Sequence, residues 1–274
     1  MSETRNGLKT ITPKAELLQN VEDLIKTLDP RPQGAPMTIR DEERRVLAVR
    51  QYFRFSKAEL DKKWAWSDVE MTRFMKSDDR LEAEAKIKAV IRAFEKLSKD
   101  QVSLMSAEPR RLIRTLHVQI GFWNGNQSVH YLGEQLIEKL LNLSPHWTGK
   151  LDLFKKYLTG HGPHHQVELE EMTIKGAGKK GEDLKIKRSP THATPGLSDH
   201  GRASAFDFIV IRKSDRQVVA GTVTKSIPEK WDRAGYTDML KQAVFNAGNH
   251  FEGPLGAPKK GIYEPWHYVY HRSP

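Results

Sequence analysis

A carboxylate lies inside an apolar segment of β-type composition, and this feature constrains the fold of the chain more than any other. The segment runs from Ala205 to Arg212 and reads AFDFIVIR. Its β-branched and aromatic residues predict a strand. A charged carboxylate in a buried strand is costly unless it is paired with a cation or bound to a metal. The fold therefore has to bring a partner to Asp207.

A second segment, near the end of the sequence, places histidine in a similar context. It reads EPWHYVYH, from Glu264 to His271. Pro265 cannot donate to a sheet ladder, so Glu264 is expected at the start or the edge of a strand. Beyond it, side chains alternate between faces, so Trp266 and the two tyrosines share one face and His267 lies on the other. We predict that His267 and Glu264 reach the same pocket.

His200 precedes Asp207 by seven residues. At this spacing, neither a straight strand nor a helix brings two side chains close enough to bind the same metal ion. Two residues seven apart lie roughly 23 Å apart in a straight strand and about 10 Å apart in a helix. Bonds from a metal ion to its protein ligands are only about 2 Å long. The residues GRASA between the two are mostly small and permit a tight turn. We therefore predict that the backbone curls between His200 and Asp207.

Two histidines and one aspartate form a donor set that suits zinc. The chain has no cysteine, which excludes thiolate ligands and a cysteine nucleophile. Three protein ligands leave one position open for water, as in catalytic zinc sites. A carboxylate that is not a ligand, such as Glu264, can take the proton from that water. The alternatives are that Asp207 pairs with Arg or Lys and that His267 is hydrogen-bonded in the core.

Both segments resemble motifs of the D-Ala-D-Ala carboxypeptidase and dipeptidase family of zinc peptidases. This family includes the vancomycin-resistance enzymes and several phage endolysins. Its first motif reads Ser-x-His-x-x-Gly-x-Ala-x-Asp. Four residues of this chain match it in place: Ser198, His200, Ala205 and Asp207. Ala203 stands where the family usually has glycine.

The second motif of the family reads Glu-x-x-His, commonly with Trp before the histidine. Glu264, Trp266 and His267 match it, and the resemblance covers roughly residues 185–271, about a third of the chain. The resemblance implies a zinc peptidase with Glu264 as general base. It implies three zinc ligands: His200, Asp207 and His267.

Further site residues follow from the same resemblance. Members of the family use an upstream arginine to polarise the scissile carbonyl and stabilise the oxyanion. Arg188 is the candidate, with Arg114 and Arg202 as alternatives. Asp199 flanks a ligand and is expected to support it. The expected substrate-binding residues are Ser198, Arg202, Trp231 and Trp266, although Trp231 is equally well explained as a core residue.

Helical periodicity runs through most of the first hundred residues, as in AELLQNVEDLIKTLD from Ala15 to Asp29. Asp41 and Ser67 are predicted to cap the helices that follow them. The stretch PRPQGAP, from Pro30 to Pro36, is predicted to be a break between helices. We therefore predict an all-helical N-terminal module over residues 1–105.

The second half of the chain predicts an α+β domain over residues 106–274, with an antiparallel sheet and flanking helices. A polar turn joins strands at 205–212 and 217–224 into a hairpin. The segment EPWHYVYH supplies a final strand, and residues 238–246 form the centre of a helix. This domain contains both motifs and is the predicted peptidase domain.

The formal net charge of +10 favours polyanionic partners, although a basic surface without a dedicated partner is equally compatible with it. No apolar run approaches the ~20 residues that span a bilayer, and the first thirty residues contain no signal-peptide core. We predict a peptidase that hydrolyses peptidoglycan stem peptides, as a D,D-carboxypeptidase or a related endopeptidase. Such a protein would be made in the cytoplasm and act on the cell wall after release, after injection or as a virion component.

Two other functions are compatible with the sequence. One is a binding module of the same fold that keeps zinc for structure alone, although such a module does not need Glu264. The other is nucleic-acid binding through RRVLAVRQYFRF, in which a set of apolar residues instead has the spacing of a core face: Val46, Leu47, Val49, Tyr52 and Phe53. The histidines of HGPHH match no ligand pattern, so we predict a surface loop at His161, His164 and His165.

Overall fold

The chain folds into two compact units, each built from two separate segments. The computed structural model describes residues 12–106, 113–160, 167–178, 181–190, 192–222, 227–257 and 260–271. Unit 1 comprises Met1–Lys62 and His117–Gly196, and unit 2 comprises Lys63–Leu116 and Leu197–Pro274. This division does not coincide with the boundary near residue 105 that the sequence predicted. The histidines of HGPHH lie outside the described residues.

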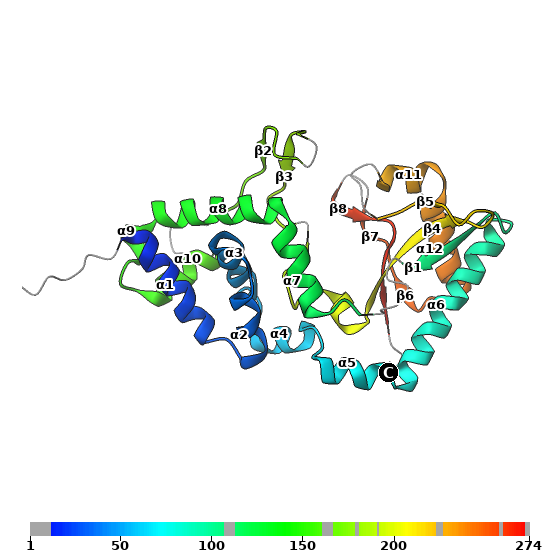
Figure 1. Cartoon of the computed structure of the whole chain (residues 1–274), viewed down its shortest axis with the longest axis horizontal. Helices are drawn as coiled ribbons and strands as arrows, with labels where there is room; N and C mark the ends of the chain where they lie inside the picture. The colour runs from blue at the N-terminus through cyan, green and yellow to red at the C-terminus, as the bar shows by residue number, and fades with distance from the viewer. Residues whose placement is uncertain are drawn as a thin grey trace, which may run out of the picture. The chain divides into compact units, whose positions relative to one another are not determined.

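In the residues of unit 1 that the structure describes, the elements are helices apart from one small hairpin (Figure 1). Its elements are α1 (Pro13–Lys26), α2 (Pro30–Met37), α3 (Glu42–Tyr52), α4 (Lys57–Lys63), α7 (Leu116–Gly125), α8 (Gln127–Asn142), α9 (Ser144–Trp147), α10 (Leu151–Thr159), β2 (Met172–Ile174) and β3 (Leu184–Ile186). Helix α4 ends and α7 begins one residue beyond the limits of this unit. The hairpin pairs β2 with β3 in antiparallel fashion.

The predicted break at residues 30–36 is wrong, because this segment forms α2. Pro30 occupies the first helical position, where the backbone N–H has no partner within the helix in any case. Proline therefore starts this helix rather than interrupting it. The predicted caps are confirmed: Asp41 accepts a hydrogen bond from the backbone of Arg44, and Ser67 forms a capping box with Glu70.

Helices α3 and α8 of unit 1 pack with their backbones in close approach. A Cβ atom added at Gly133 of α8 would lie 2.1 Å from the carbonyl oxygen of Glu43 in α3. Only glycine leaves room for this contact. The close approach brings the first turn of α3 beside the side chains of α8.

Unit 2 is α+β, with helices packed against an antiparallel sheet (Figure 1). Its elements are α5 (Asp68–Met75), α6 (Asp78–Leu97), β1 (Val102–Ser106), the 3₁₀ turn η1 (Asp199–Arg202), β4 (Ala205–Arg212), β5 (Val218–Ala220), α11 (Ile227–Arg233), α12 (Tyr236–Asn246), β6 (Phe251–Glu252), β7 (Leu255–Ala257), β8 (Lys260–Glu264) and β9 (His267–Tyr270). The order in the sheet is β1-β4-β9-β6, with β5 also beside β4. Strands β7 and β8 form a separate two-stranded ribbon.

One face of the sheet in unit 2 forms its core. Phe206 and Phe208 of β4 and Tyr268 and Tyr270 of β9 are buried in one cluster with apolar side chains of α6 and α12. Side chains alternate along each strand, so the residues between these aromatics point to the opposite face. The predicted alternation in EPWHYVYH is confirmed, and the predicted hairpin is present as β4 and β5. The second face is thus left for polar side chains.

Among the described residues, no helix combines the length and the apolar composition that crossing a membrane requires.

Candidate metal centre

Strands β4 and β9 place Asp207 directly opposite His267. The Nδ1 atom of His267 lies 2.9 Å from Oδ1 of Asp207. Both side chains are largely buried, with 12% and 13% of their surface exposed, respectively. The two residues therefore meet because antiparallel register brings the two predicted strand segments together, on the face opposite the aromatic core.

His200 reaches the same aspartate through a tight turn. The residues from Asp199 to Arg202 form η1, and Ala203 follows in the left-handed region with a φ of 50°. Backbone hydrogen bonds hold the turn from other parts of unit 2: Arg114 N–H donates to His200 at 2.9 Å, and Trp66 N–H donates to Gly201 at 2.9 Å. The predicted curl between His200 and Asp207 is therefore present.

Three potential ligand atoms converge, one from each of the residues that the sequence suggested as metal ligands. The Nε2 atom of His200 lies 3.5 Å from Oδ1 of Asp207, and the two histidine rings have centroids 5.0 Å apart. One potential ligand atom from each of the three residues lies within 4.8 Å of the others. Ligand atoms of a tetrahedral zinc site are roughly 3.3 Å apart, given bonds of about 2.0 Å. The distances of 2.9 and 3.5 Å from Asp207 to the two histidines bracket that separation.

The electrostatics of Asp207 also suit a cation. Burial acts to raise the pKa of this carboxyl, but hydrogen bonds and charge from His200 and His267 outweigh burial and hold the pKa well below its usual range. The Nη2 atom of Arg114 donates to Oδ2 of Asp207 at 3.2 Å. Asp207 therefore pairs with an arginine through Oδ2, as the alternative interpretation of the sequence held, while its Oδ1 atom faces both histidines.

Glu264 ends β8 and stands beside this group. Its Oε2 atom lies 3.9 Å from Nδ1 of His267, and 30% of its side chain is exposed. Burial raises the pKa of Glu264; the positive charge of His267 opposes this effect, and the negative charge of Asp207 adds to it. A carboxylate with a raised pKa that still reaches solvent is suited to accept and return a proton.

The predicted oxyanion arginine, Arg188, is placed in unit 1. It is exposed, and its charge acts on Glu170 of the same unit. Within unit 2, Arg114 contacts Asp207 of the candidate metal centre, and it was one of the alternatives. Arg114 lies 93 positions from Asp207 in the sequence, so no local pattern favoured it over Arg188.

The predicted substrate-binding residues differ in accessibility. Arg202 is half-buried, whereas Ser198 is buried with 7% of its surface exposed. Trp231 is fully buried, donates through Nε1 to the carbonyl of Gly221, and packs against Trp266 with ring centroids 6.4 Å apart. These contacts support the interpretation of Trp231 as a core residue behind the metal centre. Asp199, which flanks a ligand, is exposed, and its carbonyl accepts the N–H of Ser204.

A second group of possible metal ligands lies in unit 1, and sequence reasoning did not find it. Asp41, Glu43 and His130 each place a ligand atom within 4.8 Å of the others. The Nδ1 atom of His130 lies 3.8 Å from an oxygen of each carboxylate. The close packing of α8 on α3 at Gly133 brings these residues together. No local sequence pattern indicated this group, because its residues come together only where the two helices pack.

Comparison of the chain with models of protein families, with curated proteins and with solved structures finds no match.

Proposed function

We propose that the chain is a zinc-dependent peptidase. The observation that carries this proposal is the convergence of His200, Asp207 and His267 on one face of the sheet, with Glu264 beside them. Three ligands with an adjacent carboxylate match the composition of a catalytic zinc site more closely than that of a structural one. The resemblance of the two motifs to the D-Ala-D-Ala carboxypeptidase family supports the same activity.

In this proposal, each step of peptide hydrolysis is assigned to a side chain of unit 2. Zinc held by the two histidines and Asp207 would supply a Lewis acid that polarises a carbonyl and acidifies water. Glu264 takes a proton from the attacking water and passes it to the leaving amine. Arg114 offers positive charge to the carbonyl oxygen as it becomes negative. In this proposal Arg114 takes the role that the sequence assigned to Arg188.

The proposed substrates are peptidoglycan stem peptides, cut by a D,D-carboxypeptidase or related endopeptidase reaction. The resemblance supports this choice, and the net charge of +10 suits an anionic cell wall. In this proposal the protein is made in the cytoplasm and reaches the wall after release, after injection or as a virion component.

The test combines metal content with product analysis. Wild-type protein, Glu264→Gln and the control Glu229→Gln are assayed for bound zinc and incubated with purified peptidoglycan, and the released products are identified by mass spectrometry. Glu229 is an exposed residue of α11. We expect one zinc in all three proteins and at least about a hundredfold slower cleavage by Glu264→Gln alone. Cleavage by Glu264→Gln at the wild-type rate would contradict the proposal, and zinc without any cleavage would favour a binding module.

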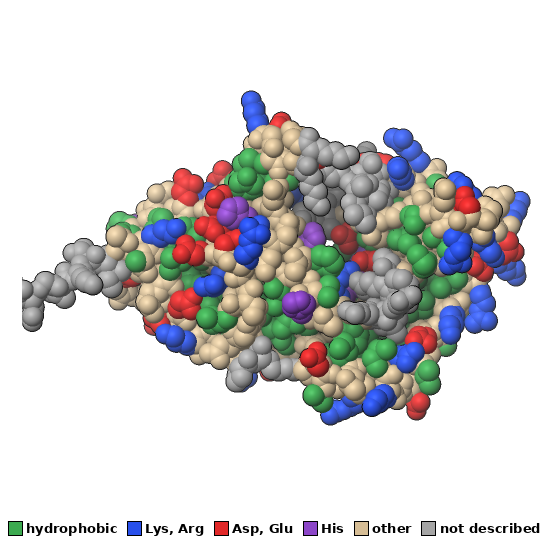
Figure 2. Space-filling view, viewed as in Figure 1, with side chains coloured by type: hydrophobic (Ala, Val, Ile, Leu, Met, Phe, Trp, Pro, Cys, Tyr) green, Lys and Arg blue, Asp and Glu red, His purple; other side chains and the backbone are tan. Residues whose placement is uncertain are grey.

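Nucleic-acid binding receives less support. In the segment RRVLAVRQYFRF, Arg44 and Arg50 are buried, with 5% and 4% of their surface exposed, so these two cations cannot contact phosphates. Tyr52 and the aliphatic residues of α3 are buried as well. On the face in Figure 2, the coloured Lys and Arg side chains are interspersed with Asp and Glu and do not gather in one patch.

A further inference from the structure

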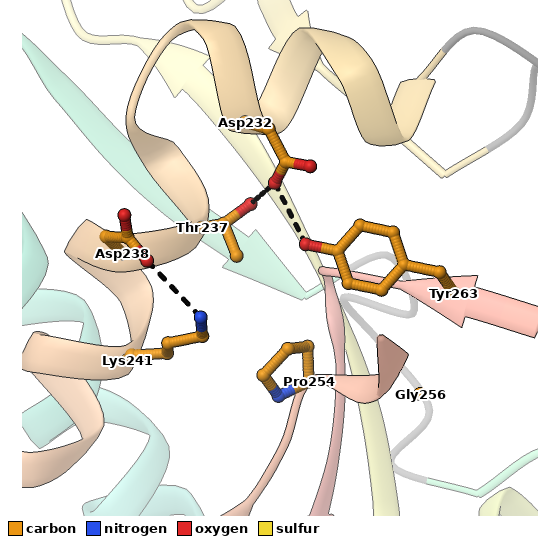
Figure 3. Close-up of a pocket in the computed structure, with 7 residues that line it drawn as sticks. All are labelled: Asp232, Thr237, Asp238, Lys241, Pro254, Gly256 and Tyr263. Carbon is orange, nitrogen blue, oxygen red and sulfur yellow. Dashed lines mark hydrogen bonds and ion pairs between the residues drawn. The ribbon is translucent and has the colours of Figure 1, made fainter. Parts of the chain in front are cut away.

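A cavity in unit 2 is lined by side chains that do not belong to the metal centre. Its volume is about 370 Å³, and its walls come from α11, α12, the residues around β7, and β8 (Figure 3). Sites for small ligands are typically about 300–1,000 Å³ in volume, so this cavity has the size for a single small group. The residues that decide its chemistry are Asp232, Thr237, Asp238, Lys241, Pro254 and Tyr263.

Asp232 is held in a fixed orientation at one side of this cavity. Its Oδ1 atom accepts hydrogen bonds from the hydroxyl of Thr237 at 2.6 Å and from the hydroxyl of Tyr263 at 2.9 Å. Among the described residues, none donates a hydrogen bond to the second oxygen, which points away from both donors in Figure 3. Two donors on one oxygen orient the carboxylate and leave the other oxygen for a ligand. Such an oxygen is a strong acceptor for an ammonium group.

Lys241 supplies the opposite charge from α12. Its Nζ atom lies 3.2 Å from Oδ1 of Asp238, and both side chains are well exposed, at 48% and 88%. An exposed ion pair of this kind contributes little energy, so a ligand can replace or join it. A lysine ammonium also has three N–H donors, of which Asp238 uses one. Pro254 and the ring of Tyr263 provide apolar surface in the same cavity (Figure 3).

We propose that this cavity binds the zwitterionic end of an amino acid, with its ammonium group on Asp232 and its carboxylate on Lys241. A ligand with an amine alone would leave unused the two N–H donors of Lys241 that Asp238 does not occupy. A ligand with a carboxylate alone would face the negative charge of Asp232. Only a group that carries both charges complements both walls, and its short aliphatic stem would lie against Pro254 and Tyr263.

The cavity is coupled to the metal centre by neighbours in sequence. Tyr263 directly precedes Glu264 in β8, and the two side chains point to opposite faces of the ribbon. Asp232 directly follows Trp231, which packs against Trp266. As part of a substrate site, the inference rests on the proposed peptidase function. It then names the substrate class: peptides whose diamino acid carries a free ammonium and a free carboxylate on one carbon.

A binding experiment without hydrolysis tests this inference. The full-length protein is titrated with meso-diaminopimelate, with cadaverine (amines only) and with pimelate (carboxylates only). Binding is followed at the backbone amides of Thr237 and Gly256 by two-dimensional NMR, which separates this cavity from any chelation at the metal centre. We expect diaminopimelate to shift both amides and to bind at least about tenfold more tightly than either other probe. No shift at these amides, or equal binding of cadaverine, would overturn the inference.

Substitutions assign the two charges. Asp232→Asn keeps an oxygen that can accept from Thr237 and Tyr263, so the fold should persist. We expect it to weaken diaminopimelate binding at least about tenfold, and Lys241→Gln to do the same. Glu229→Gln, also on α11 but outside the cavity, should bind like the wild type. Wild-type affinity in both cavity variants would overturn the inference.

The outcomes also separate this inference from the proposed peptidase function. Diaminopimelate binding at the cavity without cleavage of peptidoglycan would leave the cavity standing and remove the peptidase function. Cleavage of peptidoglycan without diaminopimelate binding at the cavity would support the peptidase function and overturn the inference about the cavity.

Discussion

Two groups of histidine and carboxylate side chains, one in each unit, show how differently similar residues can be used. In unit 2, His200 is 4% exposed and Asp207 lies within a strand of the sheet. In unit 1, the side chain of His130 is 32% exposed, and the two carboxylates grouped with it, Asp41 and Glu43, belong to the start of α3. A third carboxylate, Glu134 of α8, lies 3.4 Å from its Nε2 atom. The distances among possible ligand atoms do not distinguish the groups, since both fall within the same 4.8 Å limit.

The difference lies in what else the carboxylates do. Asp41 accepts the backbone N–H of Arg44 as an N-cap with one oxygen and pairs with the Arg44 guanidinium through the other. Negative charge at a helix start is favourable without any metal. Asp207 caps no helix, and one of its oxygens faces two histidines. Proximity alone therefore does not define a metal centre, whereas burial and a carboxylate oxygen that faces two histidines rather than a helix start favour one.

The largest expected effect concerns where zinc binds. We expect His267→Ala to weaken zinc binding by at least about a hundredfold, because it removes one of three ligands. The matched variant His130→Ala should keep one zinc per chain. Zinc content by mass spectrometry and affinity by calorimetry check both variants. Two zinc ions per wild-type chain, one of them lost in His130→Ala, would show that the group in unit 1 binds zinc as well.

The next effect concerns the packing that assembles the group in unit 1. Gly133→Ala should destabilise the protein by about 3 kcal/mol, because a Cβ would lie 2.1 Å from the carbonyl oxygen of Glu43. Gly121→Ala in α7 is the control, since nothing lies within 4 Å of its Cβ, and alanine should gain up to about 1 kcal/mol there. Urea denaturation measures both variants. Similar stability of the two would show that α3 and α8 are not in such close contact.

A smaller effect is expected at the turn that carries His200. Ala203 has a φ of 50° and is fully buried. Ala203→Val should cost about 2 kcal/mol, since a β-branched residue is strained in the left-handed region and overfills the site. Ala203→Gly should be nearly neutral, because relief of about 1 kcal/mol of strain offsets the loss of a buried methyl worth about 0.8 kcal/mol. A higher melting temperature for Ala203→Val than for Ala203→Gly would show that residue 203 does not adopt a left-handed conformation.

The smallest effect is expected at the helix cap of unit 2, with the cap of unit 1 as its comparison. Ser67→Ala in unit 2 should cost about 1 kcal/mol, as is usual for loss of an N-cap. Asp41→Ala in unit 1 should cost more, because it also leaves the buried Arg44 without its carboxylate. Chemical denaturation gives both values, and Ser67→Asp, which keeps a cap, serves as control. Equal losses would show that Asp41 has no role beyond capping and is freer to bind a cation than we infer.

The sequence predicted those features of the candidate metal centre that depend on local pattern. Alternation in EPWHYVYH placed His267 opposite the aromatic face, and small residues after His200 allowed the turn. Arg114 could not be chosen in this way, because its contact with Asp207 joins segments 93 residues apart. The misjudged α2 had a local cause: the prolines were interpreted as breaks, although proline is well tolerated in the first turn of a helix.

The division into units was not predictable by inspection of composition, because each unit combines two segments. Residues 63–106 have the helical periodicity of the N-terminal region, yet α6 packs on the sheet of unit 2 and β1 pairs with β4. Helical pattern shows which face of a helix is apolar but not which partner covers it. A boundary placed at the change from helical to β-type pattern therefore falls inside unit 2.

The interleaving of the two units has a consequence for synthesis on the ribosome. The first segment of unit 2, which supplies Arg114 and α6, is made before the second segment of unit 1 exists. Until β4 and β9 have been translated, β1 lacks the strand it pairs with and the apolar side chains of α6 lack the aromatic residues they pack against. The three proposed metal ligands lie between residues 200 and 267, so the growing chain cannot assemble this group until residue 267 has been translated.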